Sequence, residues 1–128
     1  MKNGLQEQAG TPRTDAAENI FYFEDHLLRQ LLANAIGETP VRFFFPEGLK
    51  RLRQHDLSSE VSYIDTLRVY LNNNMSISRT AREMALHRSS LIDRLERIRQ
   101  ILDLDLSDPD TRLTLQIALR AEELKPDD

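Results

Sequence analysis

Residues 76–98 decide the fold, and they read Ser-Ile-Ser-Arg-Thr-Ala-Arg-Glu-Met-Ala-Leu-His-Arg-Ser-Ser-Leu-Ile-Asp-Arg-Leu-Glu-Arg-Ile. Ser76 can cap a short helix that carries Ile77, Ala81 and Met84 on one face. The pattern breaks at residues 85–87, and a second helix follows, with apolar residues at Leu91, Leu95, Ile98 and Leu102. The small side chain of Ala81 allows the two helices to cross closely. This arrangement predicts a helix-turn-helix, whose second helix can enter a DNA major groove.

The overall composition fits one hydrophobic core. The chain has 128 residues, of which 40% are hydrophobic, and it contains no cysteine. The absence of cysteine excludes a disulfide framework and a thiolate zinc site. No apolar run is long enough to span a bilayer, and the polar N-terminus does not resemble a signal peptide. We therefore expect a cytoplasmic protein that makes no membrane contact.

Charge is segregated along the chain, although the net charge is only −4. Residues 63–102 hold seven arginines against four acidic residues, which gives this segment a net charge of +3. Residues 103–128 carry −5 and residues 1–62 carry −2. The positive segment coincides with the predicted helix-turn-helix, which favours a nucleic-acid partner. An arginine-rich, solvated helix surface is the alternative interpretation of the same charges.

Helical patterns also precede this motif. Residues 1–15 have no apolar period and are expected to form a flexible leader. A helical stripe follows from Ile20 to Ala35 and ends at Gly37, although Ile20–Phe23 could instead be a strand left from a preceding domain. Two short helices are predicted near residues 40–45 and 46–55, because proline is tolerated in a first turn.

Two longer helices flank the motif. Ser58 or Ser59 is predicted to cap a helix that runs to Leu71, turns Val61 inward and is closed by the asparagines at 72–74. The last helix is expected to start with Ser107 as its cap and Asp110 closing a capping box. Its predicted buried residues are Leu113, Leu115, Ile117, Ala118 and Leu119.

These patterns predict an all-α fold, a compact bundle of about six helices that contains the helix-turn-helix. We divide the chain into a leader at 1–15, an N-terminal helical part at 16–58, a DNA-binding domain at 59–124 and a tail at 125–128.

The motif and its surroundings resemble the C-terminal domain of the PucR/CdaR family. The likeness rests on residues 66–74, Thr80-Ala81, the block His-Arg-Ser-Ser-Leu-Ile-Asp-Arg-Leu-Glu-Arg-Ile at 87–98, and residues 104–109 and 112–120. It extends more weakly upstream and covers roughly residues 20–124. The helix-turn-helix is also similar to that of the factor for inversion stimulation, through residues 79, 81, 84, 88, 90 and 91.

The resemblance implies a bacterial transcriptional regulator of catabolic genes. Family members carry this domain at the C-terminus of a longer chain, behind a sensor region and a cyclase-like domain. It thus implies that an effector is sensed by a region absent from this chain, which is either an excised C-terminal piece or a short stand-alone relative. The sequence departs from the family pattern at Ser89, where asparagine is usual, at Ser90, where threonine is usual, and at Asp93, where tyrosine or a basic residue is usual.

We expect sequence-specific binding of double-stranded DNA by a homodimer, because half-sites mirror a protein two-fold axis. The predicted contacts are the polar residues of the motif: Ser76, Ser78, Arg79, Thr80, His87, Arg88, Ser89, Ser90, Asp93, Arg94 and Arg97. Arg88 is expected to bind guanine or phosphate, Asp93 to accept from cytosine N4 or to repel phosphate, and Arg97 to meet the backbone. Alternatively, Arg94 pairs with Glu83 or Asp65, His87 satisfies a backbone group, and the hydroxyls at 76, 78 and 80 only cap the first helix.

No catalytic, metal or cofactor site is predicted. The three histidines lie far apart, no spacing gathers metal ligands, and there is no glycine-rich phosphate loop. The rival function is a helical protein-interaction or dimerisation module without direct DNA contact. Phe43, Phe44 and Phe45 suggest it, since three consecutive aromatic side chains cannot all face one small core. Packing of these residues between two helices is the alternative.

Overall fold

The computed structural model describes residues 16–38, 40, 43 and 45–124. Within these residues the chain forms six α-helices and no strand, so the all-α prediction is confirmed. The helices are α1 (Ala16–Ile36), α2 (Glu47–Asp56), α3 (Tyr63–Asn72), α4 (Ile77–Met84), α5 (Arg88–Leu102) and α6 (Pro109–Leu124). The predicted leader at 1–15 and tail at 125–128 lie outside the described residues, as do Thr39 and Phe44.

Helix α1 belongs to a compact unit of its own, which ends at Gly37. It runs unbroken through Ile20–Phe23, so the alternative of a strand there is wrong. Gly37 ends the helix as predicted, with a φ of +56° that suits a residue without a Cβ atom. Within the predicted helix at 40–45, the described backbone forms only a turn, in which the Phe43 amide donates to the Pro40 carbonyl.

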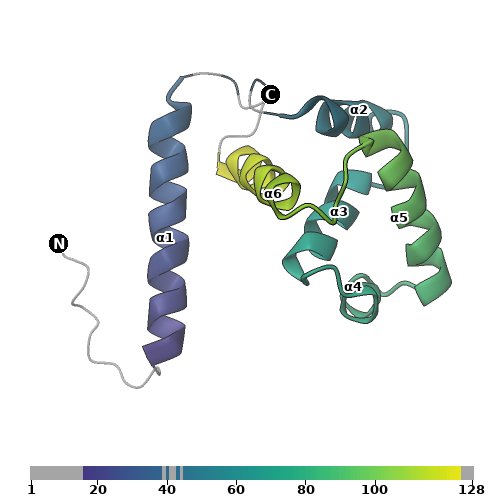
Figure 1. Ribbon diagram of the computed structural model, residues 1–128, viewed down its shortest axis with the longest axis horizontal. Coiled ribbons are helices and arrows are strands. Elements are labelled where there is room, and N and C mark those ends of the chain that lie inside the picture. The colour runs from purple at the N-terminus through teal and green to yellow at the C-terminus, as the bar shows by residue number, and fades with distance from the viewer. Residues whose placement is uncertain (1–15, 39, 41–42, 44, 125–128) are drawn as a thin grey trace. The chain divides into compact units, whose positions relative to one another are not determined.

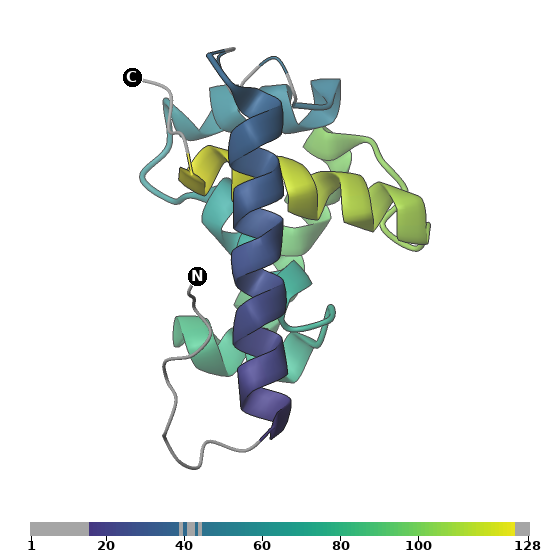
Figure 2. The ribbon, with the colours of Figure 1, turned by 90° about the vertical axis from the view of Figure 1, so that its left-hand side faces the viewer.

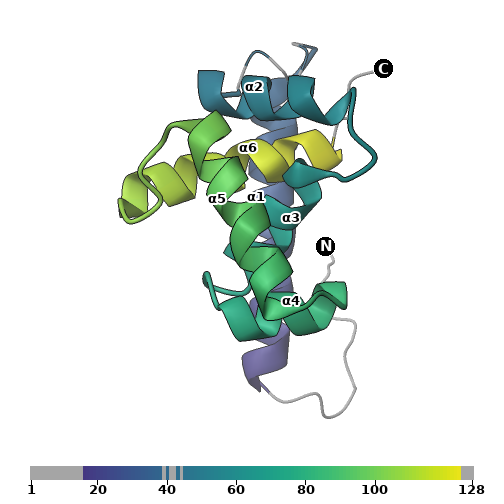
Figure 3. The same ribbon diagram turned by 90° about the vertical axis from the view of Figure 1, so that its right-hand side faces the viewer.

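The second unit, Glu38–Asp128, holds the other five helices. Helices α3 and α5 run side by side between α2 at one end and α4 at the other (Figures 1 and 3). Helix α6 packs on the opposite side of α3 from α5 (Figures 1 and 2). Because α6 lies away from α4, it leaves the outer surface of the helix-turn-helix uncovered.

The core of this unit is built from the apolar stripes of its helices. On α5, Leu91, Leu95, Ile98 and Leu102 are all buried, as the sequence predicts. The neighbouring helices contribute the other buried side chains of this core: Leu49, Leu52, Ile64, Leu67, Tyr70, Leu71, Ala81, Leu115, Ala118 and Leu119. Burial of this apolar surface fixes how α4 and α5 sit on α3.

Helix α2 is part of the same unit, which the predicted division at 58/59 would have split. A Cβ atom at Gly48 would lie 2.0 Å from the carbonyl oxygen of Leu102, so the helices touch backbone to backbone. Arg51 on α2 donates to the carbonyls of Ile101 and Leu102, at 2.9 and 3.1 Å. These bonds satisfy two carbonyls that the end of α5 leaves without a helical partner.

The start of α3 differs from its prediction. The cap is Ser62, whose hydroxyl accepts from the Asp65 amide, and not Ser58 or Ser59. Asp56 at the end of α2 also accepts from the amides of Tyr63 and Ile64, both at 2.9 Å. The helix therefore starts where two side chains together bind its first amides, and Val61 lies exposed before it.

The start of α6 and the face that this helix buries also differ from their predictions. Asp108, and not Ser107, accepts from the Asp110 amide, while Ser107 donates to Asp105 through its hydroxyl and its amide. These two bonds lower the pKa of the Asp105 carboxyl. Leu113 and Ile117, predicted to be buried, are 56% and 38% exposed, because the packed face of α6 runs through Leu115, Ala118, Leu119 and Ala121.

Candidate nucleic-acid interface

The turn between α4 and α5 sets the angle of the motif. Ala85 adopts left-handed backbone geometry, with φ of +56°. Its amide donates to the Arg82 carbonyl and the Leu86 amide donates to the Ala81 carbonyl, at 3.2 and 2.9 Å. This pair of bonds is a Schellman motif, which ends α4 and turns the chain. The predicted break at residues 85–87 is confirmed, and the two helices do not form one rod.

The junction before α4 is equally defined. Asn74 and Met75 both have positive φ, at 54° and 63°. The Asn73 side-chain amide donates to the Val69 carbonyl at 2.9 Å and to Glu83 on α4 at 3.0 Å. Ser76 then caps α4 as predicted by accepting from the Arg79 amide. Helix α4 is thus held at both ends, on α3 and on α5.

The outer surface of α5 is polar. Arg88, Ser89, Ser90, Asp93, Glu96 and Arg97 are all exposed, over the first three turns of the helix. On α4, Ser78 and Arg79 are exposed beside the half-buried cap Ser76. The structure therefore brings most of the predicted contact residues together on the outside of one motif.

The arginines of the second unit that the structure describes fall into two groups. Four of them, Arg79, Arg82, Arg88 and Arg97, are exposed and hold no ion pair or side-chain hydrogen bond with any described residue. All four lie on α4 and α5. Exposed arginines without an intramolecular partner keep their donors available for phosphate or base oxygens.

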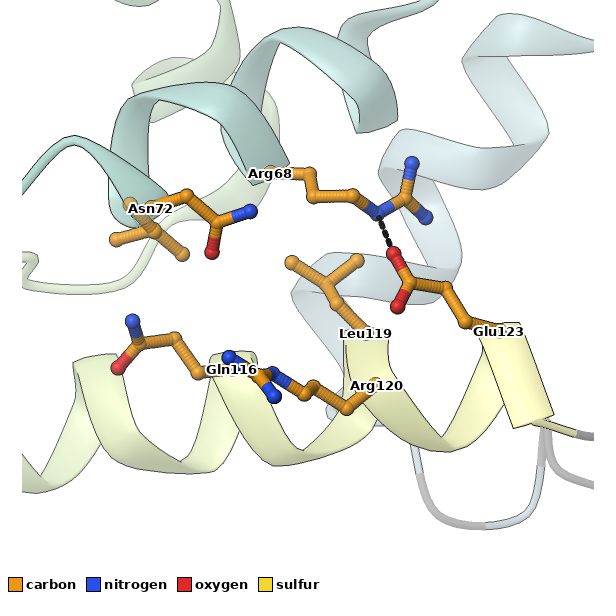
Figure 4. A pocket seen from close by; sticks show the side chains of 7 residues that line it. Arg68, Asn72, Gln116, Leu119, Arg120 and Glu123 are labelled. Carbon is orange, nitrogen blue, oxygen red and sulfur yellow. Dashed lines mark ion pairs between the residues drawn. The ribbon is translucent and has the colours of Figure 1, made fainter. Parts of the chain in front are cut away.

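The other described arginines of this unit are engaged within the fold. Arg68 on α3 forms ion pairs with Glu122 and Glu123 on α6, at 3.4 and 3.0 Å, and Figure 4 shows the second of these. Arg53 also pairs with Glu122, and Arg112 donates to the Leu106 carbonyl. The small pocket between α3 and α6, about 180 Å³, is therefore bordered by a guanidinium that is already neutralised.

Two predicted contact residues turn inward. Thr80 is fully buried, because it lies on the inner face of α4 beside Ala81, and its hydroxyl has no partner among the described residues. Arg94 is half-buried and donates to Thr66 on α3 at 3.1 Å, so it pairs with neither Glu83 nor Asp65. Both side chains face the core of the motif and not its outer surface.

His87 and Arg82 are two further exposed residues of the motif, and the alternative that His87 satisfies a backbone group at the start of α5 is wrong. His87 is exposed, and its imidazole makes no capping bond to the backbone at the start of α5. Arg82 was not among the predicted contacts, although it follows Arg79 by three residues and so shares its side of α4. The three-residue spacing between Arg79 and Arg82 is the feature of the sequence that could have identified Arg82 as a contact residue.

Among the described helices, none combines the length and the apolar composition needed to cross a membrane.

Comparison with known proteins gives a family and two relatives. Residues 63–121 match the family described as the PucR C-terminal helix-turn-helix domain. The chain is 36% identical over 114 residues to the purine catabolism regulatory protein of Bacillus subtilis (strain 168), across 88% of the chain and 20% of that protein. It is 43% identical over 54 residues to an uncharacterized protein in the pkwA 5' region of Thermomonospora curvata, across 42% of the chain and 30% of that protein.

The chain thus spans a fifth of the first relative and less than a third of the second. No solved structure matches it significantly.

Proposed function

Because residues 63–121 belong to the PucR C-terminal helix-turn-helix family, we propose that this chain binds double-stranded DNA sequence-specifically as the DNA-binding part of a transcriptional regulator. It would act by binding alone, without catalysis or a cofactor.

One observation carries this proposal: among the described residues of the second unit, every arginine without a partner lies on α4 or α5. Within the second unit, the described arginines outside α4 and α5 are all engaged, whereas Arg79, Arg82, Arg88 and Arg97 are left exposed on the motif. Four exposed guanidinium groups on one motif favour binding to a polyanion.

In this proposal the first turns of α5 enter the major groove. Arg88, Ser89, Ser90 and Asp93 would then face base edges, and Arg97, farther along the helix, would meet the DNA backbone. Ser78, Arg79 and Arg82 on α4 would contact phosphates, next to the first amides of that helix. His87 lies between the two groups and would contact the backbone.

The acidic residues of α5 favour base readout over binding to phosphates alone. Asp93 and Glu96 are exposed among the arginines and form no ion pair with a described residue. Carboxylates at this surface oppose nonspecific binding to phosphate, whereas Asp93 can accept from cytosine N4 in the groove.

We further propose that two copies bind two half-sites related by a two-fold axis, as other helix-turn-helix proteins do. An effector would be sensed by a region outside this chain, since the chain spans only part of its relatives.

The test is the salt dependence of DNA binding, measured by fluorescence anisotropy with the full chain and duplexes selected from a random pool. Each phosphate that is neutralised contributes a slope of about 0.9 in log affinity against log salt. Substituting any one of Arg79, Arg82 or Arg97 with alanine should lower the slope by about one.

The matched control is Arg29→Ala on α1, which removes the same charge outside the motif. An unchanged slope in all three motif variants, or an equal loss in the control, would contradict the proposal.

A second candidate function rests on an apolar surface beside α2. Leu57 is 76% exposed and borders a groove of about 330 Å³ with Phe43, Phe45 and the side chains of Lys50 and Arg53. This groove could hold a second copy of the chain, as an interaction module without DNA contact would require. Light scattering over a range of concentrations tests it: Leu57→Ser should convert a dimer to a monomer, and a parent protein that is monomeric throughout removes this candidate.

A further inference from the structure

Ile92 is an apolar residue on the polar surface of α5. Its side chain is 44% exposed, whereas Leu91, Leu95 and Ile98 on the same helix are each exposed by 1% or less. The cause is helical phase, since each residue advances about 100° around the axis and Ile92 lies one step away from the buried stripe. It is not part of the buried core that holds α5 in place.

The neighbours of Ile92 on this surface are the residues proposed to face DNA. Arg88 and Ser89 lie one turn before it, Asp93 follows it, and Glu96 lies one turn after it, and all four are exposed. Of these, Arg88, Ser89 and Glu96 are three or four residues from Ile92 and so share its side of the helix. Ile92 therefore lies beside Arg88 and Ser89, two of the residues proposed to face base edges.

The chemistry of the major groove offers one apolar group at its base edges, the C5 methyl of thymine. Arginine, serine and aspartate can read donors and acceptors, but only an apolar side chain gains from burying a methyl group against it. We propose that Ile92 reads a thymine methyl in the half-site and so determines specificity at that base pair. This inference rests on the proposed function, because it requires α5 to lie in the major groove.

The experiment removes the methyl group without changing base pairing. Duplexes selected from a random pool are remade with deoxyuridine in place of each thymine in turn, and binding to the full chain is measured by fluorescence anisotropy. For the parent protein, uracil at one position of each half-site should weaken binding by about fourfold, the value expected for one buried methyl group. Ile92→Ala should bind thymine and uracil duplexes equally at that position.

The matched control is Ile117→Ala, which removes the same exposed side chain from α6 and should keep the sensitivity to uracil. Circular dichroism and thermal unfolding verify that both variants are folded.

The proposal is overturned if sequence-specific binding ignores every uracil, if the selected sites lack thymine, or if Ile92→Ala keeps the parent's penalty. In each of these results the proposed function stands, because specific binding is still observed. A chain that shows no sequence preference at all overturns the proposed function as well.

Discussion

Gly48 on α2 and Leu102 at the end of α5 are in backbone contact. A Cβ atom placed on Gly48 would lie 2.0 Å from the Leu102 carbonyl oxygen and 2.9 Å from its carbonyl carbon. Arg51, one turn farther along α2, donates to the same carbonyl. Helix α2 therefore anchors the far end of the proposed recognition helix, although it contributes nothing to the DNA-facing surface.

Gly48→Ala should destabilise the protein by about 3 kcal/mol or more, because the clash is with backbone atoms that cannot rotate away. The free energy of unfolding, measured in urea, checks this. Glu47→Ala, at the neighbouring position, is the control: it removes only an exposed ion pair with Lys50 and should lower the free energy of unfolding by less than about 1 kcal/mol. Equal stability of Gly48→Ala and the parent protein would show that the two helices do not approach so closely.

Ala85→Gly should stabilise the protein by roughly 1 kcal/mol, because a left-handed conformation is costly for any residue with a Cβ atom. For a unit of this size, the melting temperature should rise by about 4–8 °C. DNA affinity should stay the same, since the Schellman bonds are made by the backbone. A lower melting temperature would mean that the turn does not have this geometry.

Thr80→Val should stabilise the protein by about 1 kcal/mol, since it replaces a buried hydroxyl without a partner by a methyl group of similar shape. Affinity for DNA should be unchanged, which separates Thr80 from the exposed residues of α4. If the variant is folded but binds DNA more weakly, the hydroxyl does contact phosphate.

The helices were largely predictable from the sequence, because each is specified by a local apolar period. Neighbouring residues alone were enough to predict the buried stripe through Leu91, Leu95 and Ile98 and the cap at Ser76. The start of α3 was not predictable from neighbouring residues alone. Three serines lie between residues 58 and 62, and the structure uses Ser62 because the Asp56 carboxylate, from the previous helix, binds the first amides beside it.

The candidate site was predictable in outline but not residue by residue. A helical wheel places Arg94 on the flank of α5, yet its partner Thr66 is 28 residues away along the chain. Similarly, Arg68 pairs with Asp65 three residues before it but has two further acidic partners on α6, more than 50 residues later. Which arginines remain available for DNA depends on such distant contacts, and local spacing does not contain them.

Asp93→Asn should raise affinity for unrelated duplexes by roughly fivefold at low salt, because it removes a carboxylate that repels nearby phosphates. It should also weaken the preference for cytosine at the base pair that Asp93 reads. Anisotropy with selected and scrambled duplexes measures both effects. Glu60→Gln, an exposed acidic residue before α3, is the control for net charge. Unchanged binding to scrambled DNA would place Asp93 away from the phosphates.

Arg88→Ala and Arg97→Ala should weaken DNA binding in different ways. Arg88 is the first residue of α5, where a recognition helix reaches base edges, and a bidentate contact to guanine is expected there. Its removal should cost about 1–3 kcal/mol on the selected duplex and relax sequence preference at one base pair. Arg97 lies nine residues later, so its removal should weaken binding to all duplexes alike and lower the salt slope by about one.

Titrations of both variants against the selected duplex and its single-base-pair substitutions, at several salt concentrations, separate these effects. Both side chains are exposed and unengaged with described residues, so both variants should unfold at the parent's temperature. A uniform loss across all duplexes for Arg88→Ala would assign that arginine to phosphate. The remaining specificity would then come from Ser89, Ser90, Ile92 and Asp93.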